Sequence, residues 1–201
     1  MLIAECECLL MPTSFQLEHF PHATILRLTS NDGTNRLTRD CVSAATHALR
    51  ELASTPRPLI IAGNERFFSA GADLEEIAAL RGGADAHQFS LLGQALMNNI
   101  ANFPAPVWAA IRGYCMGGGL DLALACHRRI ASAHAIFGHR GAALGLITGW
   151  GGTQRLPRLL GKARALQMLI AAEKLTATEA LRVGLVDKIC EDPEHAVAKL
   201  L

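Results

Sequence analysis

The sequence predicts an α/β domain built around a partly parallel sheet. Half of its 201 residues are apolar and 18% are charged, which is enough for a buried core and is not typical of disordered chains. Two short apolar runs, Leu59–Ala62 and Val107–Ile111, suit buried strands, and segments with helical periodicity follow them. Strands that alternate with helices are typical of crossover connections, which join parallel strands.

The N-terminal part of the chain predicts a tail and a hairpin. Residues 1–12 show no periodic pattern, so we expect a tail there and one folded domain over residues 13–201. Residues 15–19 and 23–29 each alternate in hydrophobicity, which is typical of two paired strands. The first elements of the domain are therefore expected to form a hairpin.

Helices and further strands are predicted in the rest of the chain. Thr38 is suited to cap a helix that continues to about residue 53, because its hydroxyl can accept a hydrogen bond from a free amide of the first turn. A third, weaker strand is predicted near residues 129–133. From residue 152 onward the pattern is mostly helical, with candidate helices at 156–160, 163–172 and 177–183 and a strand-like segment at 185–189.

The charge balance and the cysteines exclude several classes of protein. Nineteen basic and eighteen acidic residues give a net charge of +1, so no nucleic-acid or membrane-surface partner is expected. No apolar run approaches the roughly 18 residues of a membrane span, and the N-terminus lacks the basic residues of a secretory signal. Six scattered cysteines in a chain with its own core favour reduced thiols and a cytoplasmic location. Cys6 and Cys8 are too close in sequence for a zinc knuckle, so no metal site is expected.

The glycine clusters do not match either standard nucleotide-binding motif. The phosphate-binding pattern G-x-x-x-x-G-K-[ST] is absent from the sequence. The dinucleotide pattern G-x-G-x-x-G also fails, because Leu122 and Gln154 occupy the last glycine position after Gly117 and Gly149. A nucleotide-binding α/β domain is therefore disfavoured.

Two other glycine-rich segments share one design. Residues 67–74 follow the first apolar run and residues 113–125 follow the second, and each leads into a helical pattern. Small residues where a strand passes into a helix leave backbone N–H groups unhindered at the positive end of that helix. Two such groups that converge on one point form an oxyanion hole, which suits a thioester carbonyl that becomes an enolate.

These segments carry a resemblance to a known family. Phe68-Ser-Ala-Gly-Ala-Asp-Leu, Gly113-Tyr-Cys-Met-Gly-Gly-Gly-Leu-Asp-Leu-Ala and Gly151-Gly-Thr-Gln-Arg-Leu-Pro-Arg, in that order, resemble the enoyl-CoA hydratase/isomerase (crotonase) superfamily. The resemblance implies a crotonase-like spiral of ββα repeats, with a helical C-terminal part that is short for the family. It also implies an acyl-CoA or acyl-carrier thioester substrate, no cofactor apart from the CoA of that substrate, and a homotrimer or hexamer.

The resemblance assigns roles to individual residues. It implies that the backbone N–H groups of Ala72 and Gly118 form the oxyanion hole. It further implies that substrate passes the segment that contains Ser69, Ala70 and Gly71. Gly117, beside the second amide, and Trp150, in the next glycine-rich segment, are further candidates for substrate contact.

The acid–base residues depart from the family pattern. Asp121 matches the first of the two glutamates that hold water in a hydratase of this family, and Gly141 matches the second. Glycine cannot give or take a proton, and a positioned general acid or base contributes about 10²–10⁴-fold. Ordinary enoyl-CoA hydration is therefore not expected, and His139 becomes a candidate replacement because of its usual pKa.

Each of these side chains also has a structural interpretation. Asp121 suits the first turn of a helix, where its charge would complement the helix dipole. His139 could be a solvated loop residue, and Trp150 could serve packing alone. Arg140 could pair with a neighbouring subunit instead of a substrate. Two functions consequently stay open: an enzyme that acts on acyl thioesters, and a catalytically silent protein of the same fold that binds a thioester or a partner subunit.

Overall fold

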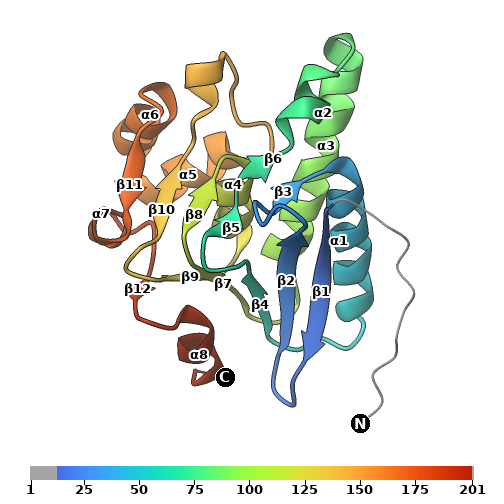
Figure 1. Cartoon of the computed structure of the whole chain (residues 1–201), viewed down its shortest axis with the longest axis vertical. Helices are drawn as coiled ribbons and strands as arrows, with labels where there is room; N and C mark the ends of the chain where they lie inside the picture. Colours follow the sequence, from blue (N-terminus) through green and yellow to red (C-terminus); the bar gives the residue numbers. More distant parts are fainter. Residues whose placement is uncertain (1–12, 201) are drawn as a thin grey trace.

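The computed structural model describes residues 13–200, so the predicted tail at 1–12, with Cys6 and Cys8, lies outside the described residues. The main sheet has the strand order β1-β2-β4-β7-β9-β12 (Figure 1). Its strands are β1 (Thr13–His19), β2 (Thr24–Ser30), β4 (Leu59–Ala62), β7 (Val107–Ile111), β9 (Arg128–Ala131) and β12 (Lys188–Ile189). Strands β1 and β2 form the predicted antiparallel hairpin, and the other neighbours pair in parallel. The partly parallel sheet is therefore confirmed.

Two smaller sheets lie outside the sequence prediction. One has the order β11-β10-β8-β5, and in the other β3 pairs with β6. Their strands are β3 (Arg36–Leu37), β5 (Phe67–Ser69), β6 (Gly71–Ala72), β8 (Tyr114–Met116), β10 (Ile136–Gly138) and β11 (Lys174–Thr176). Both glycine-rich segments thus contain short strands. Strands of two or three residues are too short for a periodic pattern to predict.

The helices follow the predicted pattern closely. They are α1 (Arg39–Leu52), α2 (Leu74–Ala78), α3 (Gly82–Ala101), α4 (Gly118–Ala125), α5 (Gly152–Leu160), α6 (Lys162–Ile170), α7 (Ala177–Arg182) and α8 (Pro193–Ala198), with a 3₁₀ turn, η1 (Gly141–Leu144). Thr38 caps α1 as predicted, and its hydroxyl accepts from the backbone N of Cys41. Helix α5 begins four residues before its predicted start.

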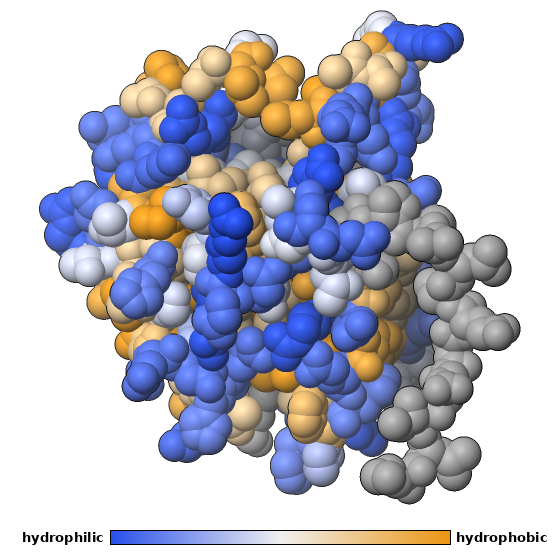
Figure 2. Space-filling model, in the orientation of Figure 1, coloured by the Kyte–Doolittle hydropathy of each residue, from blue (hydrophilic) through white to orange (hydrophobic). Residues whose placement is uncertain are grey.

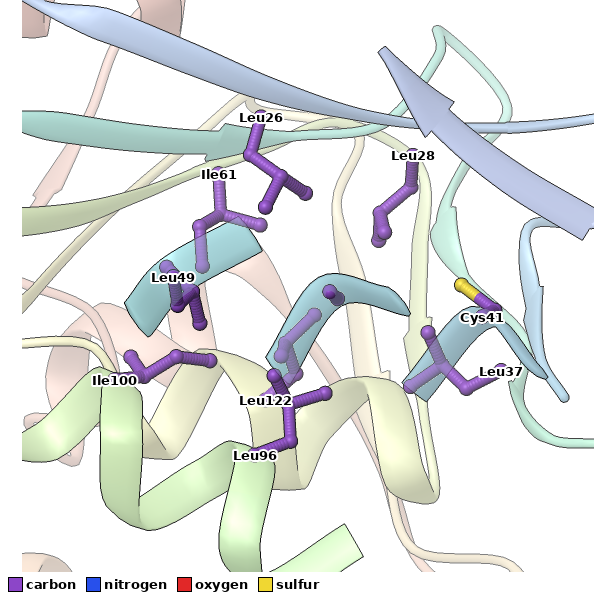
Figure 3. A pocket seen from close by; sticks show the side chains of 10 residues that line it. Leu26, Leu28, Leu37, Cys41, Leu49, Ile61, Leu96, Ile100 and Leu122 are labelled. Carbon is purple, nitrogen blue, oxygen red and sulfur yellow. The ribbon is translucent and has the colours of Figure 1, made fainter. Parts of the chain in front are cut away.

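The core lies between the main sheet and helices α1, α3 and α4. Figure 3 shows Leu26 and Ile61 of the sheet pointing toward Leu49, Ile100 and Leu122 of the helices. The space between these side chains is only about 10 Å³ and has an apolar lining, so it is a packing gap and not a binding site. Among residues 13–200, no helix is long and apolar enough to cross a membrane.

Candidate active site

One cavity of about 360 Å³ gathers almost all of the predicted site residues. It lies between the two glycine-rich segments, helices α2 and α3, and residues 139–150. Its lining includes Ala70, Gly71, Ala72, Gly117, Gly118, Asp121, His139, Gly141 and Trp150. Ser69 was predicted to contact substrate, but the structure places it behind the cavity wall. Its hydroxyl donates to the Asn35 carbonyl (2.7 Å) and accepts from the backbone N of Gly71 (3.1 Å), so it supports the wall.

The backbone amides of Ala72 and Gly118 lie next to each other. A Cβ atom placed on Gly118 would be 3.0 Å from the Ala72 nitrogen, and one placed on Gly71 would be 2.9 Å from the Gly118 nitrogen. Gly118 is the first residue of α4, so its N–H has no acceptor within the helix and lies at the positive helix end. Two amides that lie this close together are suited to bind one developing oxyanion.

Asn35 holds this wall in place, a role that no pattern in the sequence predicted. It is buried and has a positive φ of 52°, a conformation that asparagine tolerates better than most residues. Its Nδ2 donates to the carbonyls of Phe67 (2.9 Å) and Phe68 (3.3 Å). The adjacent strand β3 pairs with β6, which contains Ala72. Asn35 thus connects strand β5, which precedes Ala72 in the chain, with strand β3, which pairs with β6.

Asp121 is almost completely buried in the first turn of α4, where it lines the cavity. The hydroxyl of Thr148 donates to its Oδ2 atom, and its Oδ1 atom lies 3.3 Å from Nε2 of His139. Burial raises the pKa of Asp121 to about 7, although Thr148, the charge of Arg155 and two backbone amides favour the charged form. A carboxyl group with a pKa near 7 can both give and take a proton at neutral pH.

His139 is buried, with an exposed fraction of 3%, so the interpretation as a solvated loop residue is wrong. It directly follows strand β10, and its ring nitrogen Nε2 faces Asp121. Burial lowers the pKa of His139 to about 4, so the ring is neutral at pH 7. The structure therefore pairs a neutral histidine with a carboxyl group that titrates near neutrality.

Gly141 lines the same cavity and offers no side chain for proton transfer. It begins η1, and its carbonyl accepts a hydrogen bond from the backbone N of Leu146 (2.9 Å). A Cβ atom on Gly141 would lie 2.8 Å from the carbonyl oxygen of Leu146, which is closer than Cβ atoms come in proteins. Among the described residues that line the cavity, Asp121 is the only carboxylic acid.

Trp150 both packs and lines the cavity. Its ring fills the space beside two glycines, since a Cβ atom would lie 2.2 Å from the ring at Gly93 and 2.7 Å from it at Gly118. Its Nε1 donates to the carbonyl of Phe89 (3.2 Å), and the two rings lie 5.4 Å apart. The ring of Trp150 therefore lies against the cavity wall that contains Gly118.

The edge of the cavity carries exposed apolar side chains. Leu74 of α2, Leu144 of η1 and Ile147 line the cavity, and their exposed fractions are 53%, 59% and 74%. Figure 2 shows apolar side chains near a hollow along the upper edge of the molecule. Exposed apolar residues that surround a cavity are typical of a binding site. Arg140 is exposed on the same cavity and forms no ion pair with a residue in the described range.

Two residues near the site have structural contacts. Asp73 caps α2 and accepts from the backbone N of Glu75 and Glu76. Arg155 donates to the Trp150 carbonyl (3.2 Å) and to Oδ1 of Asn98 (3.0 Å), so it joins α5 to α3. Thr148 was missed, because a single hydroxyl in a glycine-rich segment gives no signal in the sequence.

Comparison with known proteins supports this description. The profile of the Enoyl-CoA hydratase/isomerase family matches residues 22–200. A probable enoyl-CoA hydratase of Bacillus subtilis is 46% identical over 143 residues, which are 71% of this chain and 55% of that protein. The fatty acid oxidation complex subunit alpha of Shewanella halifaxensis is 44% identical over 131 residues, which are 64% of this chain and 18% of that protein. The chain thus spans about half or less of the length of these two curated relatives.

Solved structures show the same fold. The crystal structure of an enoyl-CoA hydratase from Bacillus anthracis matches with a TM-score of 0.87 and 31% sequence identity. The match covers 92% of this chain and 74% of that chain. The crotonase-like α/β fold that the resemblance implied is therefore confirmed.

Proposed function

The chain belongs to the enoyl-CoA hydratase/isomerase family, and from this premise we propose that it is an enzyme that acts on acyl-CoA thioesters. In this proposal the amides of Ala72 and Gly118 hold the thioester oxygen, and Asp121 moves a proton next to it. One observation carries the proposal: both amides and the only cavity-lining carboxylic acid of the described residues share one cavity. Its apolar edge suits an acyl chain.

The proposed chemistry is proton transfer at the carbon next to the thioester. When Asp121 takes a proton from that carbon, the electron pair of the C–H bond moves into an enolate, and the negative charge collects on the thioester oxygen. Two amides that are already oriented stabilise this charge, and loss of one such donor typically costs on the order of 10²–10³ in rate. The raised pKa of Asp121 allows the same group to return the proton.

The proposed reaction belongs to the lyase or isomerase class of the family, in fatty acid metabolism. A hydration that needs two carboxylic acids is not proposed, because Gly141 takes the place of the second. His139 is proposed as the companion of Asp121, since its Nε2 is the ring nitrogen nearest to that carboxyl group. We further propose that the substrate is an acyl-CoA or acyl-carrier thioester and that the protein acts as a homotrimer or hexamer.

A second candidate function is thioester binding without turnover. Gly141 favours it, because one of the two acid–base groups expected from the resemblance is missing there, and a single carboxyl group of residues 13–200 lines the cavity. The buried pair of Asp121 and His139 favours the enzyme instead, since burying two titratable groups is costly and perturbed groups of this kind cluster at active sites.

Exchange of the proton next to the thioester distinguishes the two functions. We would incubate butyryl-CoA with the protein in deuterated water and follow deuterium incorporation by mass spectrometry, with Asp121→Asn beside wild type. The enzyme is expected to exchange, and the variant to lose about 10²–10⁴-fold. Calorimetric binding of butyryl-CoA without exchange by wild type would support the binding protein. Loss of the absorbance of crotonyl-CoA, measured in parallel, shows whether hydration occurs as well.

A further inference from the structure

We propose that Thr148 is a positioning residue for Asp121: its hydroxyl binds Oδ2 and so fixes the orientation of the carboxyl group that exchanges a proton with the substrate. The inference rests on the proposed function, because it concerns the same carboxyl group. Thr148 lies between the exposed Ile147 and Gly149 on the cavity, and its hydroxyl contacts a residue 27 positions earlier in the chain.

The two carboxyl oxygens of Asp121 have different surroundings. Oδ2 accepts the hydrogen bond from Thr148. Oδ1 lies 3.3 Å from Nε2 of His139, yet neither of these two buried atoms has a well-oriented hydrogen-bond partner among the described residues. Buried polar atoms are nearly always hydrogen-bonded, so such an exception calls for an explanation. The bond from Thr148 is therefore the side-chain hydrogen bond that holds this carboxyl group in place.

Steric confinement keeps the carboxyl group in this orientation. A Cβ atom on Gly152 would lie 2.2 Å from Oδ1 of Asp121 and 2.8 Å from Cγ2 of Thr148. The backbone of α5 therefore packs directly against both side chains. Rotation of the carboxyl group would exchange the two oxygens, and it would first have to break the bond to Thr148.

The other titratable groups around Asp121 come from three elements. His139 follows β10, Arg155 lies on α5, and the thiol of Cys115 lies on β8. Arg155 favours the carboxylate by its charge, and burial keeps the Cys115 thiol neutral by raising its pKa. Thr148 is uncharged, so it acts only through its hydrogen bond, which lowers the pKa of Asp121 against the effect of burial.

The step assigned to Asp121 balances without any other reactant. The carboxylate of Asp121 takes a proton from the carbon next to the thioester, and the C–H electron pair forms the enolate. The resulting O–H group then returns this proton to a carbon of the enolate. Thr148 keeps its own proton throughout, and it lowers the barrier by holding the carboxyl group in one orientation.

A titration of Asp121 without substrate tests the inference directly. We would follow the ¹³C resonance of the Asp121 carboxyl carbon against pH, with Asp121→Asn to assign it. Thr148→Val has nearly the same shape but lacks the hydroxyl, so its midpoint is expected above that of wild type. Thr148→Ser keeps the hydroxyl, so its titration midpoint is expected to lie close to that of wild type. Equal midpoints in Thr148→Val and wild type would overturn the inference.

Deuterium exchange into butyryl-CoA gives the second readout. Thr148→Val is expected to lower kcat on the order of 10- to 100-fold, the value of a hydrogen bond to a charged group, with KM changed less than about twofold. A change in KM alone would contradict a positioning role. If Thr148→Val does not fold, Thr148→Ala also removes the hydroxyl. Exchange that persists in Asp121→Asn would refute the proposed function, whereas the titration result would still decide the role of Thr148.

Discussion

The two walls of the cavity are built from different kinds of chemical group. The wall that we propose as the oxyanion hole, here called the oxyanion wall, consists of backbone amides at Ala72 and Gly118, which are fixed by short strands and a helix start. The proton-transfer wall consists of the side chains of Asp121, His139 and Thr148. The first wall keeps the family pattern, whereas the second departs from it at Gly141.

This difference shows which parts of such a site can change independently. An amide of the oxyanion wall cannot be removed by exchanging a side chain, except for proline, and added side-chain atoms collide with the opposite segment. A group of the proton-transfer wall is lost by a single substitution that leaves the backbone unaltered. The two walls should therefore respond differently to mutation, and four predictions test this.

The largest effect is expected when one amide of the oxyanion wall is removed. Gly118→Pro deletes the donor N–H at the first position of α4, and the first position of a helix otherwise accommodates proline. Gly118→Ala keeps the N–H but meets the same Trp150 ring with its Cβ atom, so it is the matched control. The proline variant is expected to exchange deuterium about 10²–10³-fold more slowly than the alanine variant. Equal rates in two folded variants would refute the proposed hole.

A smaller effect is expected when the support of that wall is removed. Asn35→Ala leaves the carbonyls of Phe67 and Phe68 without their side-chain donor in a buried place. An unsatisfied buried group costs about 1–3 kcal/mol, so the free energy of unfolding in urea should fall by that amount. Asn102→Ala removes a similar bond at an exposed helix end and is expected to cost about 0.5 kcal/mol or less. Equal losses in both variants would mean that Asn35 does not support the wall.

The difference between the walls also explains how much the sequence predicted. The hairpin, α1 with its cap at Thr38, β4 and β7 follow from local patterns, and the structure confirms them. Ala72 and Gly118 were named from the family resemblance, and the structure brings their two amides together on one cavity. Local patterns were thus sufficient for the longer strands and for α1.

Contacts between distant segments were not predictable from one sequence. Asn35 bonds to residues 32 and 33 positions later, and Thr148 bonds to Asp121 across 27 positions. His139 was expected to be solvated as readily as catalytic, since its burial depends on the packing of α5 against α4. Side chains that meet only in the folded chain leave no regular spacing in the sequence.

Placing a carboxyl group at position 141 of the proton-transfer wall should not restore hydration. In Gly141→Glu the Cβ atom would lie 2.8 Å from the Leu146 carbonyl, so the backbone has to shift. Overpacking of this kind costs about 1–3 kcal/mol, and we expect lower stability in urea and no gain in crotonyl-CoA hydration. Ala142→Glu adds the same charge at the next, exposed position and is expected to change stability by about 0.5 kcal/mol or less. Higher hydration in a stable Gly141→Glu would refute this view of the wall.

The smallest effect concerns the pH dependence of stability, in which the two titratable groups of this wall oppose each other. Burial raises the pKa of Asp121 from 3.8 to about 7, so the folded state keeps a proton that the unfolded state releases as pH rises. Its contribution to stability is present at low pH and is lost as pH rises toward about 7. Burial lowers the pKa of His139 from 6.5 to about 4, so the unfolded state takes up a proton first. Its contribution is present above pH 6.5 and is lost as pH falls toward about 4.

Removing one group should therefore reveal how the other group changes the free energy of unfolding with pH. We expect the free energy of unfolding of His139→Gln to fall as pH rises from about 4.5 to 6.5, and that of Asp121→Asn to rise, by at most about 1.4 kcal/mol per pH unit relative to wild type. His47→Gln changes an exposed histidine on α1 and should follow wild type. Urea denaturation across this range measures all four proteins. Parallel curves for the two site variants would show that the pair does not link protonation to folding. Opposite slopes for the two variants would show that the protonation of Asp121 and His139 changes the free energy of unfolding. The backbone amides of the oxyanion wall do not titrate, so they make no such contribution.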